Sequence, residues 1–173
     1  MTKTVADPDI SISGYNLYRC DRVRRKGGGV CVFIRDSLGY DVIDVPICSG
    51  EMYSLHELLY VKIKKSSQIY IFMLVYHPPR PKYQPNTLLD RLGHDVEYLT
   101  DTYPTATAHV TGNFNHLNIS QFLPNNGLHQ VVTGATRGAN TLDLLITNRP
   151  HEVSCSVVQS CMHMSVLYMF GKR

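Results

Sequence analysis

The 173-residue sequence has no long hydrophobic run. Its longest apolar stretch, residues 69–76, is far shorter than the roughly 20 residues that a membrane-spanning helix needs. The first fourteen residues contain no apolar segment of the kind found in secretory signal peptides. We therefore expect no membrane partner, and an intracellular location that is either nuclear or cytoplasmic.

The sequence has few cysteines, and none of them form a CxxC pair. Their number is odd and they are scattered along the chain, which argues against a zinc ligand set and against a disulfide framework. We expect reduced thiols, as is usual inside the cell. The five positions are Cys20, Cys31, Cys48, Cys155 and Cys161.

Charge is also limited. Seventeen Lys and Arg against fourteen Asp and Glu give a formal net charge of +3. A mildly basic surface is compatible with a polyanionic partner without itself indicating one. The hydrophobic fraction of 43% is typical of a globular chain and argues against disorder.

The apolar pattern predicts many strands and few helices. Residues 14–20 and 28–35 read as a hairpin joined by a basic, glycine-rich connection. Residues 67–79 are apolar almost throughout, which predicts a central strand buried on both faces. The helix expected within residues 84–104 begins at an Asn86 or Thr87 cap, and the apolar residues along one of its sides are expected to be buried. This apolar stripe is Leu88, Leu92, Val96 and Leu99.

Further strands are expected along most of the remaining chain, with a short helical turn near residues 116–127. Many strands with few helices favour a layered α/β (α+β) sandwich. The other expected strands are residues 40–47, 58–65, 105–112, 128–133, 141–148, 152–159 and 164–170.

Polar residues gather where four predicted strands end or begin. These places are residues 76–79, 112–116, 136–143 and 160–165. Each alone has a plain structural explanation, because asparagines favour turns and a buried tyrosine rests its ring on the core. The second place raises a chemical question, since Asn113 is neutral where a hydrolytic or metal site would use a carboxylate.

The order of the motifs resembles a known family. "GYNLYRCDRVRRKGGGVCVFIR", "ELLYVKI", "VYHPPR", "GNFNHLNI", "TRGANTLDLLITN" and "MHMSV" resemble the endonuclease domain of non-LTR retrotransposons, within the endonuclease/exonuclease/phosphatase superfamily. The resemblance runs from about residue 14 to 168. It implies an incomplete domain at residues 14–170, after a short lead (1–13) and before a tail (171–173). The implied fold is a four-layered sandwich of two mixed β-sheets with flanking helices, and its first strand–helix–strand segment is expected to be missing.

The resemblance also implies a reaction and its residues. The family hydrolyses phosphodiesters with a divalent metal, usually Mg²⁺, and the retroelement branch nicks DNA. Asn115 matches the family asparagine, and Tyr76 matches a tyrosine that contacts the phosphate. Asp143 matches an aspartate that pairs with the histidine matched by His163. These four are the candidate catalytic residues.

Two family positions are substituted. Asn113 and Met162 stand where the family has aspartates, and the family's metal-binding glutamate belongs to the missing segment. Magnesium sites depend on one or two carboxylates, so we expect no intact metal site and no bound Mg²⁺. Without a positioned general base the rate typically falls roughly 10²–10⁴-fold. The chain is therefore expected to be inactive or very weak as an endonuclease.

Two alternatives to this impaired endonuclease-like domain remain. One is a live metal-dependent phosphodiesterase that recruits Asp143, Asp101 or Glu57, and the other is a non-enzymatic module that binds nucleic acid or protein. DNA is the expected partner, bound weakly through its phosphate backbone. A missing N-terminal segment or another protein is the second expected partner, because a truncated sandwich exposes strand edges. The candidate DNA contacts are Arg22, Arg24, Arg25 and Lys26.

Overall fold

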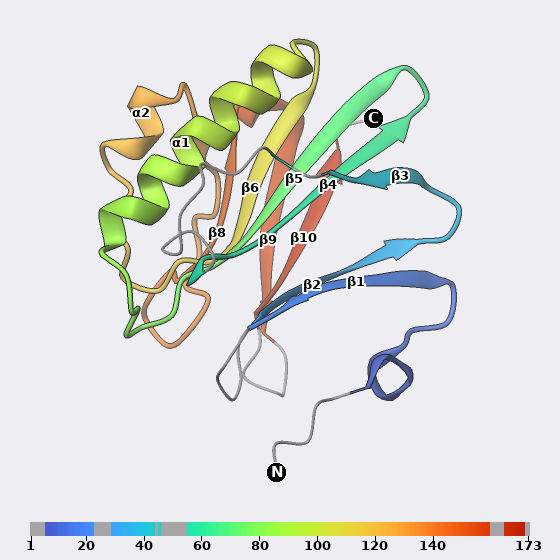
Figure 1. Ribbon diagram of the computed structural model, residues 1–173, viewed down its shortest axis with the longest axis horizontal. Helices are drawn as coiled ribbons and strands as arrows, with labels where there is room; N and C mark the ends of the chain where they lie inside the picture. Colours follow the sequence, from blue (N-terminus) through green and yellow to red (C-terminus); the bar gives the residue numbers. More distant parts are fainter. Residues whose placement is uncertain (1–5, 23–28, 44, 46–54, 160–164, 172–173) are drawn as a thin grey trace.

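The computed structural model describes residues 6–22, 29–43, 45, 55–159 and 165–171 (Figure 1). Its centre is a six-stranded sheet with the strand order β3-β4-β5-β6-β8-β7. Strands β5 and β6 are parallel, and the other neighbouring pairs are antiparallel. The strands are β3 (Gly39–Val42), β4 (Glu57–Lys65), β5 (Gln68–Tyr76), β6 (Thr107–Asn113), β7 (His129–Gln130) and β8 (Asp143–Thr147).

Helices α1 (Pro85–Thr102) and α2 (Phe122–Asn125) lie along one side of this sheet (Figure 1). The predicted stripe of α1 is confirmed, since its four residues are at most 4% exposed. They pack against Ile71, Met73 and Val75 of β5 in the main core. Within the described residues, no helix has the length and hydrophobicity needed to cross a membrane.

The predicted start of α1 is wrong. Its N-cap is Gln84 rather than Asn86 or Thr87, and Pro85 occupies the first helical position. Proline is well suited to that position because its fixed φ is already helical and it has no N–H to leave unsatisfied. The Thr87 hydroxyl, being inside the first turn, donates back to the Gln84 carbonyl at 2.8 Å.

A hairpin covers part of the opposite face of the sheet. Strands β1 (Tyr15–Asp21) and β2 (Gly29–Arg35) pair antiparallel, as the alternation of the sequence predicted. The hairpin packs Ile34 onto Leu59 and Val61 of β4 in a second, smaller core. This arrangement confirms the predicted α+β sandwich.

The remaining strands are peripheral. Strands β9 (Val153–Gln159) and β10 (Ser165–Gly171) form a second two-stranded antiparallel sheet, separate from β1–β2. Short 3₁₀ helices, η1 (Asp7–Ile10) and η3 (Pro150–Glu152), precede β1 and β9. Among the described strands, the β1–β2 and β9–β10 hairpins are not joined to each other by hydrogen bonds.

Strand β5 is central, as predicted, but it is not buried on both faces. Its residues alternate: Ile71, Met73 and Val75 are at most 1% exposed, whereas the residues between them are only half-buried. Strand β4 is instead covered on both sides over Glu57–Val61. The reason is the position of the β1–β2 hairpin, which packs over β4 and leaves part of β5 uncovered.

His109 of β6 is buried at 3% exposure and stacks on Phe72, with ring centroids 5.0 Å apart. Its Nδ1 has no hydrogen-bond partner among the described residues. Burial lowers the pKa of His109 to about 4, although Glu152 partly opposes the shift. The pKa of His109 is therefore lower in the folded chain than in the unfolded chain. The contribution of the neutral, buried ring to the free energy of unfolding is complete above about pH 6.5 and is lost as pH falls toward 4.

We expect His109→Phe to reduce the acid sensitivity of the fold. Between pH 7.5 and 4.5 the natural chain should lose about 2 kcal/mol more free energy of unfolding than the variant does. Urea denaturation at the two pH values measures the difference. His116→Gln, at an exposed position, is the matched control and should keep the natural pH dependence. Equal acid losses in the natural chain and in His109→Phe would contradict the assignment.

Candidate functional site

The sheet brings four polar side chains into one row. Glu57 of β4 pairs with Tyr76 of β5, Tyr76 pairs with Asn113 of β6, and Asn113 pairs with Asp143 of β8. Directly paired residues of neighbouring strands project from the same face of a sheet. Tyr76, Asn113 and Asp143, which the sequence placed in one site, are therefore neighbours at one end of the sheet. We call the four residues the polar row.

Asn113 and Asp143 are joined directly. The Asn113 side-chain Nδ2 donates to Asp143 Oδ1 at 2.8 Å, and its Oδ1 accepts the backbone N–H of Asn115 at 3.0 Å. The backbone donor fixes which end of the amide is oxygen, so the N–H₂ must face the carboxylate. An aspartate at position 113 would instead turn a second oxygen toward Asp143.

Asn115 links the ends of two strands. Its backbone is left-handed, with φ of 47°, and its side chain donates to the His77 carbonyl. The backbone N–H of His77 in turn donates to the Asn113 carbonyl at 2.8 Å. These bonds hold the residue that follows Tyr76 against the end of β6. Asn115 thus lies beside the polar row and fixes the spacing between its two central members.

The alternation of Asn113, Phe114 and Asn115 has a packing origin. Phe114 is fully buried in the main core, and its N–H donates to the Leu142 carbonyl at 2.8 Å. With Phe114 anchored inward, the asparagines on either side remain only half-buried. The buried ring thereby fixes the position of the loop that carries both asparagines.

Thr136 sets the backbone of Asp143. Its hydroxyl oxygen accepts the N–H of Leu142 at 2.8 Å and the N–H of Asp143 at 3.0 Å. Thr136 is itself buried at 7% exposure. The segment that the sequence singled out before Asp143 therefore positions the carboxylate from the backbone side.

Arg22 reaches the row from the β1–β2 hairpin. Its Nε donates to one carboxylate oxygen of Glu57, and the backbone N–H of Gly29 donates to the other. The guanidinium carbon lies 5.4 Å from the centroid of the Tyr76 ring, a cation–π geometry. Burial opposes the charged form, but Glu57 outweighs it and raises the pKa of Arg22. Glu57 therefore ties the hairpin to the polar row.

Sequence reasoning missed this role of Glu57. Glu57 was proposed only as an alternative acid for a metal, yet it is 6% exposed and engaged by Arg22 and Gly29. The one available signal was a glutamate opening an otherwise apolar, alternating strand. Arg22, predicted to contact DNA, is in this structure an ion-pair partner whose side chain is 19% exposed.

The carboxylates of the site do not converge. Glu57 and Asp143 are three strand spacings apart, or about 14 Å. Asp101, another alternative acid, is exposed near the end of α1 on the helical side of the sheet. Among the described residues, no three His, Cys, Asp or Glu side chains lie close enough together to hold a metal.

Several predicted site residues lie outside the described residues. Their contacts with the polar row, including the pairing of Asp143 with His163, remain predictions. They are His163, Met162, Arg24, Arg25 and Lys26.

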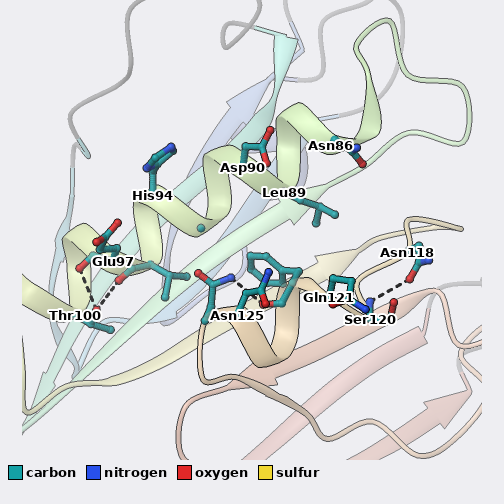
Figure 2. A pocket seen from close by; sticks show the side chains of 14 residues that line it. Asn86, Leu89, Asp90, His94, Glu97, Thr100, Asn118, Ser120, Gln121 and Asn125 are labelled. Carbon is teal, nitrogen blue, oxygen red and sulfur yellow. Dashed lines mark hydrogen bonds between the residues drawn. The ribbon is translucent and has the colours of Figure 1, made fainter.

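Two hollows among the described residues lie on opposite sides of the six-stranded sheet. The larger of the two, about 850 Å³, lies between α1 and α2 and is lined by Asp90, His94 and Glu97 of α1 and by Gln121 and Asn125 (Figure 2). It contains none of the predicted site residues. The smaller, about 260 Å³, adjoins the polar row between β2 and the β5–β6 pair.

The sequence itself has no match among protein-family models or curated proteins. Its structure does resemble solved structures. The endonuclease domain of TRAS1, a telomere-specific non-LTR retrotransposon, aligns with a TM-score of 0.60 and 12% identity, over 94% of this chain and 82% of that domain. D. rerio TDP2 complexed with a single-strand DNA product aligns with a TM-score of 0.55 and 12% identity, over 88% of this chain and 72% of that chain.

A third similar structure is the endonuclease/exonuclease/phosphatase from Bacteroides vulgatus. It aligns with a TM-score of 0.57 and 12% identity, over 91% of this chain and 77% of that one. At such low identity the likeness concerns the fold. The chain has the endonuclease/exonuclease/phosphatase fold, as its motifs predicted.

Proposed function

We propose that this protein is a retrotransposon-type endonuclease-like domain that binds nucleic-acid phosphates at the polar row and cleaves them weakly or not at all. The observation that carries the proposal is the hydrogen bond from the Asn113 amide to the Asp143 carboxylate. A neutral donor here stabilises a single carboxylate, whereas a metal-dependent nuclease needs several anionic oxygens at one point.

The described residues do not fit Mg²⁺. Asp143 accepts from Asn113, and the only oxygen of the Asn113 side chain accepts from the Asn115 backbone. Glu57 is engaged by Arg22 and Gly29 at the far end of the row. We therefore derive no catalytic step through a metal, and the live-enzyme alternative finds no support in these side chains.

Tyr76 and Arg22, also at the polar row, suit a phosphate group. The Tyr76 hydroxyl is a half-buried donor at the end of β5, and the Arg22 guanidinium lies over its ring. Phosphate oxygens accept hydrogen bonds from tyrosine and arginine, and such contacts carry little sequence information. D. rerio TDP2, which shares the fold, was solved with a single-strand DNA product, and we propose single-stranded DNA as the ligand class here.

We expect Tyr76→Phe to weaken binding of a fluorescein-labelled, single-stranded oligonucleotide about tenfold, which corresponds to one lost hydrogen bond to a charged acceptor. Fluorescence anisotropy at about 50 mM salt measures this, and affinity should fall steeply as salt rises. The matched control is Tyr98→Phe on the exposed surface of α1, which should bind as the natural chain does. Absence of binding at low salt, or equal losses in both variants, would refute the phosphate site.

Nicking of supercoiled plasmid DNA separates the proposal from a live enzyme. The natural chain is expected to give little or no nicking above buffer with either Mg²⁺ or Mn²⁺. Efficient nicking that His163→Ala abolishes would overturn the proposal, because it would show that other residues hold the metal.

A further inference from the structure

One face of β5 carries apolar side chains but is only partly covered by other elements. The face toward α1 is at most 1% exposed at Ile71, Met73 and Val75, but the residues on the opposite face are only half-buried. These are Tyr70, Phe72, Leu74 and Tyr76. Aromatic and aliphatic side chains in the middle of a sheet usually indicate a second packed layer. The β1–β2 hairpin supplies that layer over β4 but covers β5 only in part.

A cleft lies where the cover ends. It has a volume of about 260 Å³ and adjoins the polar row at Tyr76 and Asn113. Leu74 and Thr111 form its floor, and β2 forms one wall. None of its lining residues carries a charge at neutral pH. They are Gly29, Val30, Cys31, Leu74, Val75, Tyr76, Thr111, Gly112 and Asn113.

The wall of the cleft is a free strand edge. β2 pairs with β1 along its whole length, and no described strand pairs with its other edge. An unpaired edge presents a row of backbone N–H and C=O groups that can template a further strand. An open edge beside a partly uncovered apolar floor is the geometry of recognition by strand addition.

We propose that this cleft binds an extended, uncharged peptide segment that pairs with the free edge of β2 and lays alternate apolar side chains over Leu74 and Thr111. Because the cleft ends at Tyr76 and Asn113, the occupant also closes one side of the polar row. This inference does not depend on the proposed function.

A second copy of the chain fits less well. Two β2 edges pairing about a two-fold axis would place both six-stranded sheets on the same side of the joined hairpins. Each sheet continues past β5 through β6, β8 and β7, so the two sheets would occupy the same space. A single segment with no sheet beneath it avoids this collision.

The test uses a peptide of alternating valine and threonine with a lysine at each end. Cys31 lines the cleft and is exposed, whereas Cys155 lies on β9 outside it. Saturating peptide should slow alkylation of Cys31 at least about fivefold and leave Cys155 unchanged, because a paired strand covers the β2 edge. Mass spectrometry of the full chain after timed alkylation reads both sites at once.

Two controls assign the effect. The same peptide with alternate backbone amides N-methylated keeps its side chains but loses the donors of one edge, and it should protect Cys31 about tenfold more weakly. Thr111→Arg fills the cleft and should abolish protection, whereas Gln121→Arg, in the hollow between α1 and α2, should not (Figure 2).

Three results would overturn the inference. The first is no protection of Cys31 at millimolar peptide, and the second is equal protection by the N-methylated peptide. The third is a natural chain that dimerises by itself with Cys31 protected, which would make a second copy the occupant.

Discussion

Gly112→Ala is expected to lower the free energy of unfolding by more than about 4 kcal/mol, the range reserved for severe backbone conflicts. A Cβ at this position would stand 1.9 Å from the Val75 carbonyl oxygen and 2.9 Å from its carbon. The obstacle is the backbone of the parallel partner strand, which cannot rotate aside as a side chain can. The φ of +139° adds strain for any residue with a Cβ.

Gly127→Ala is the matched control for this prediction. Gly127 has a positive φ of 61°, but an added Cβ would meet nothing within 4 Å. Only the left-handed strain of about 1–2 kcal/mol should remain. Urea denaturation of the two variants compares the losses directly. Losses of similar size would mean that β5 and β6 can separate at little cost, contrary to the packing described here.

A substitution at Gly112 should also disturb the polar row. Val75 pairs with Gly112, and the next pair along the same two strands is Tyr76 with Asn113. Any separation of the strands at Gly112 therefore moves the centre of the polar row. A folded remnant of Gly112→Ala should bind single-stranded DNA more weakly than a variant of equal stability altered elsewhere.

The sequence could predict what depends on local pattern and motif order. Alternation identified the β1–β2 hairpin, and the apolar stripe of α1 identified its buried side. Tyr76, Asn113 and Asp143 come from separate segments, and only their motif order indicated that they share a site. The register of three strands then made them neighbours.

Contacts between distant segments were not predictable in this way. Glu57 meets Arg22 and Gly29 across the β1–β2 hairpin, and no periodicity or spacing encodes that meeting. The burial of β5 was overestimated for a related reason. The composition of β5 shows that its side chains are apolar. How far they are buried depends on where the β1–β2 hairpin packs, and this is a property of the assembled fold.

Asn113→Asp is expected to make the stability of the fold depend on a bound divalent metal, whereas the stability of the natural chain should not. The change replaces the donor that faces Asp143 Oδ1 at 2.8 Å with a second carboxylate oxygen. Two carboxylates so close cannot both remain charged without cost, so the pKa of the pair rises. Without metal, the variant should lose about 3 kcal/mol of stability near pH 7.

The sign of the pH dependence distinguishes repulsion from simple misfolding. A carboxyl whose folded pKa is raised stabilises the fold at low pH and loses that contribution as pH rises through the folded value. Relative to the natural chain at each pH, Asn113→Asp should therefore recover stability on acidification toward pH 4. Mn²⁺ should produce the same recovery at pH 7, because a pair of carboxylates is a ligand set for hard cations.

Thermal denaturation with and without millimolar Mn²⁺ measures the effect. At a hundredfold excess over the dissociation constant, binding adds about 2.7 kcal/mol and raises the Tm of the variant accordingly. The control is the exchanged pair, Asn113→Asp with Asp143→Asn, which keeps one amide and one carboxylate. It should resemble the natural chain, and a shift of equal size in all three proteins would contradict the prediction.

Adding Met162→Asp to Asn113→Asp then separates two causes of inactivity. If the double variant nicks supercoiled plasmid with Mn²⁺ where the natural chain does not, the substituted aspartates limit the reaction and the scaffold is otherwise sufficient. A double variant that binds Mn²⁺ but still fails to nick would show that the two restored aspartates are not sufficient for hydrolysis. In that case a metal stabilises the fold without supporting hydrolysis, because the attacking water lacks an anionic group to activate it.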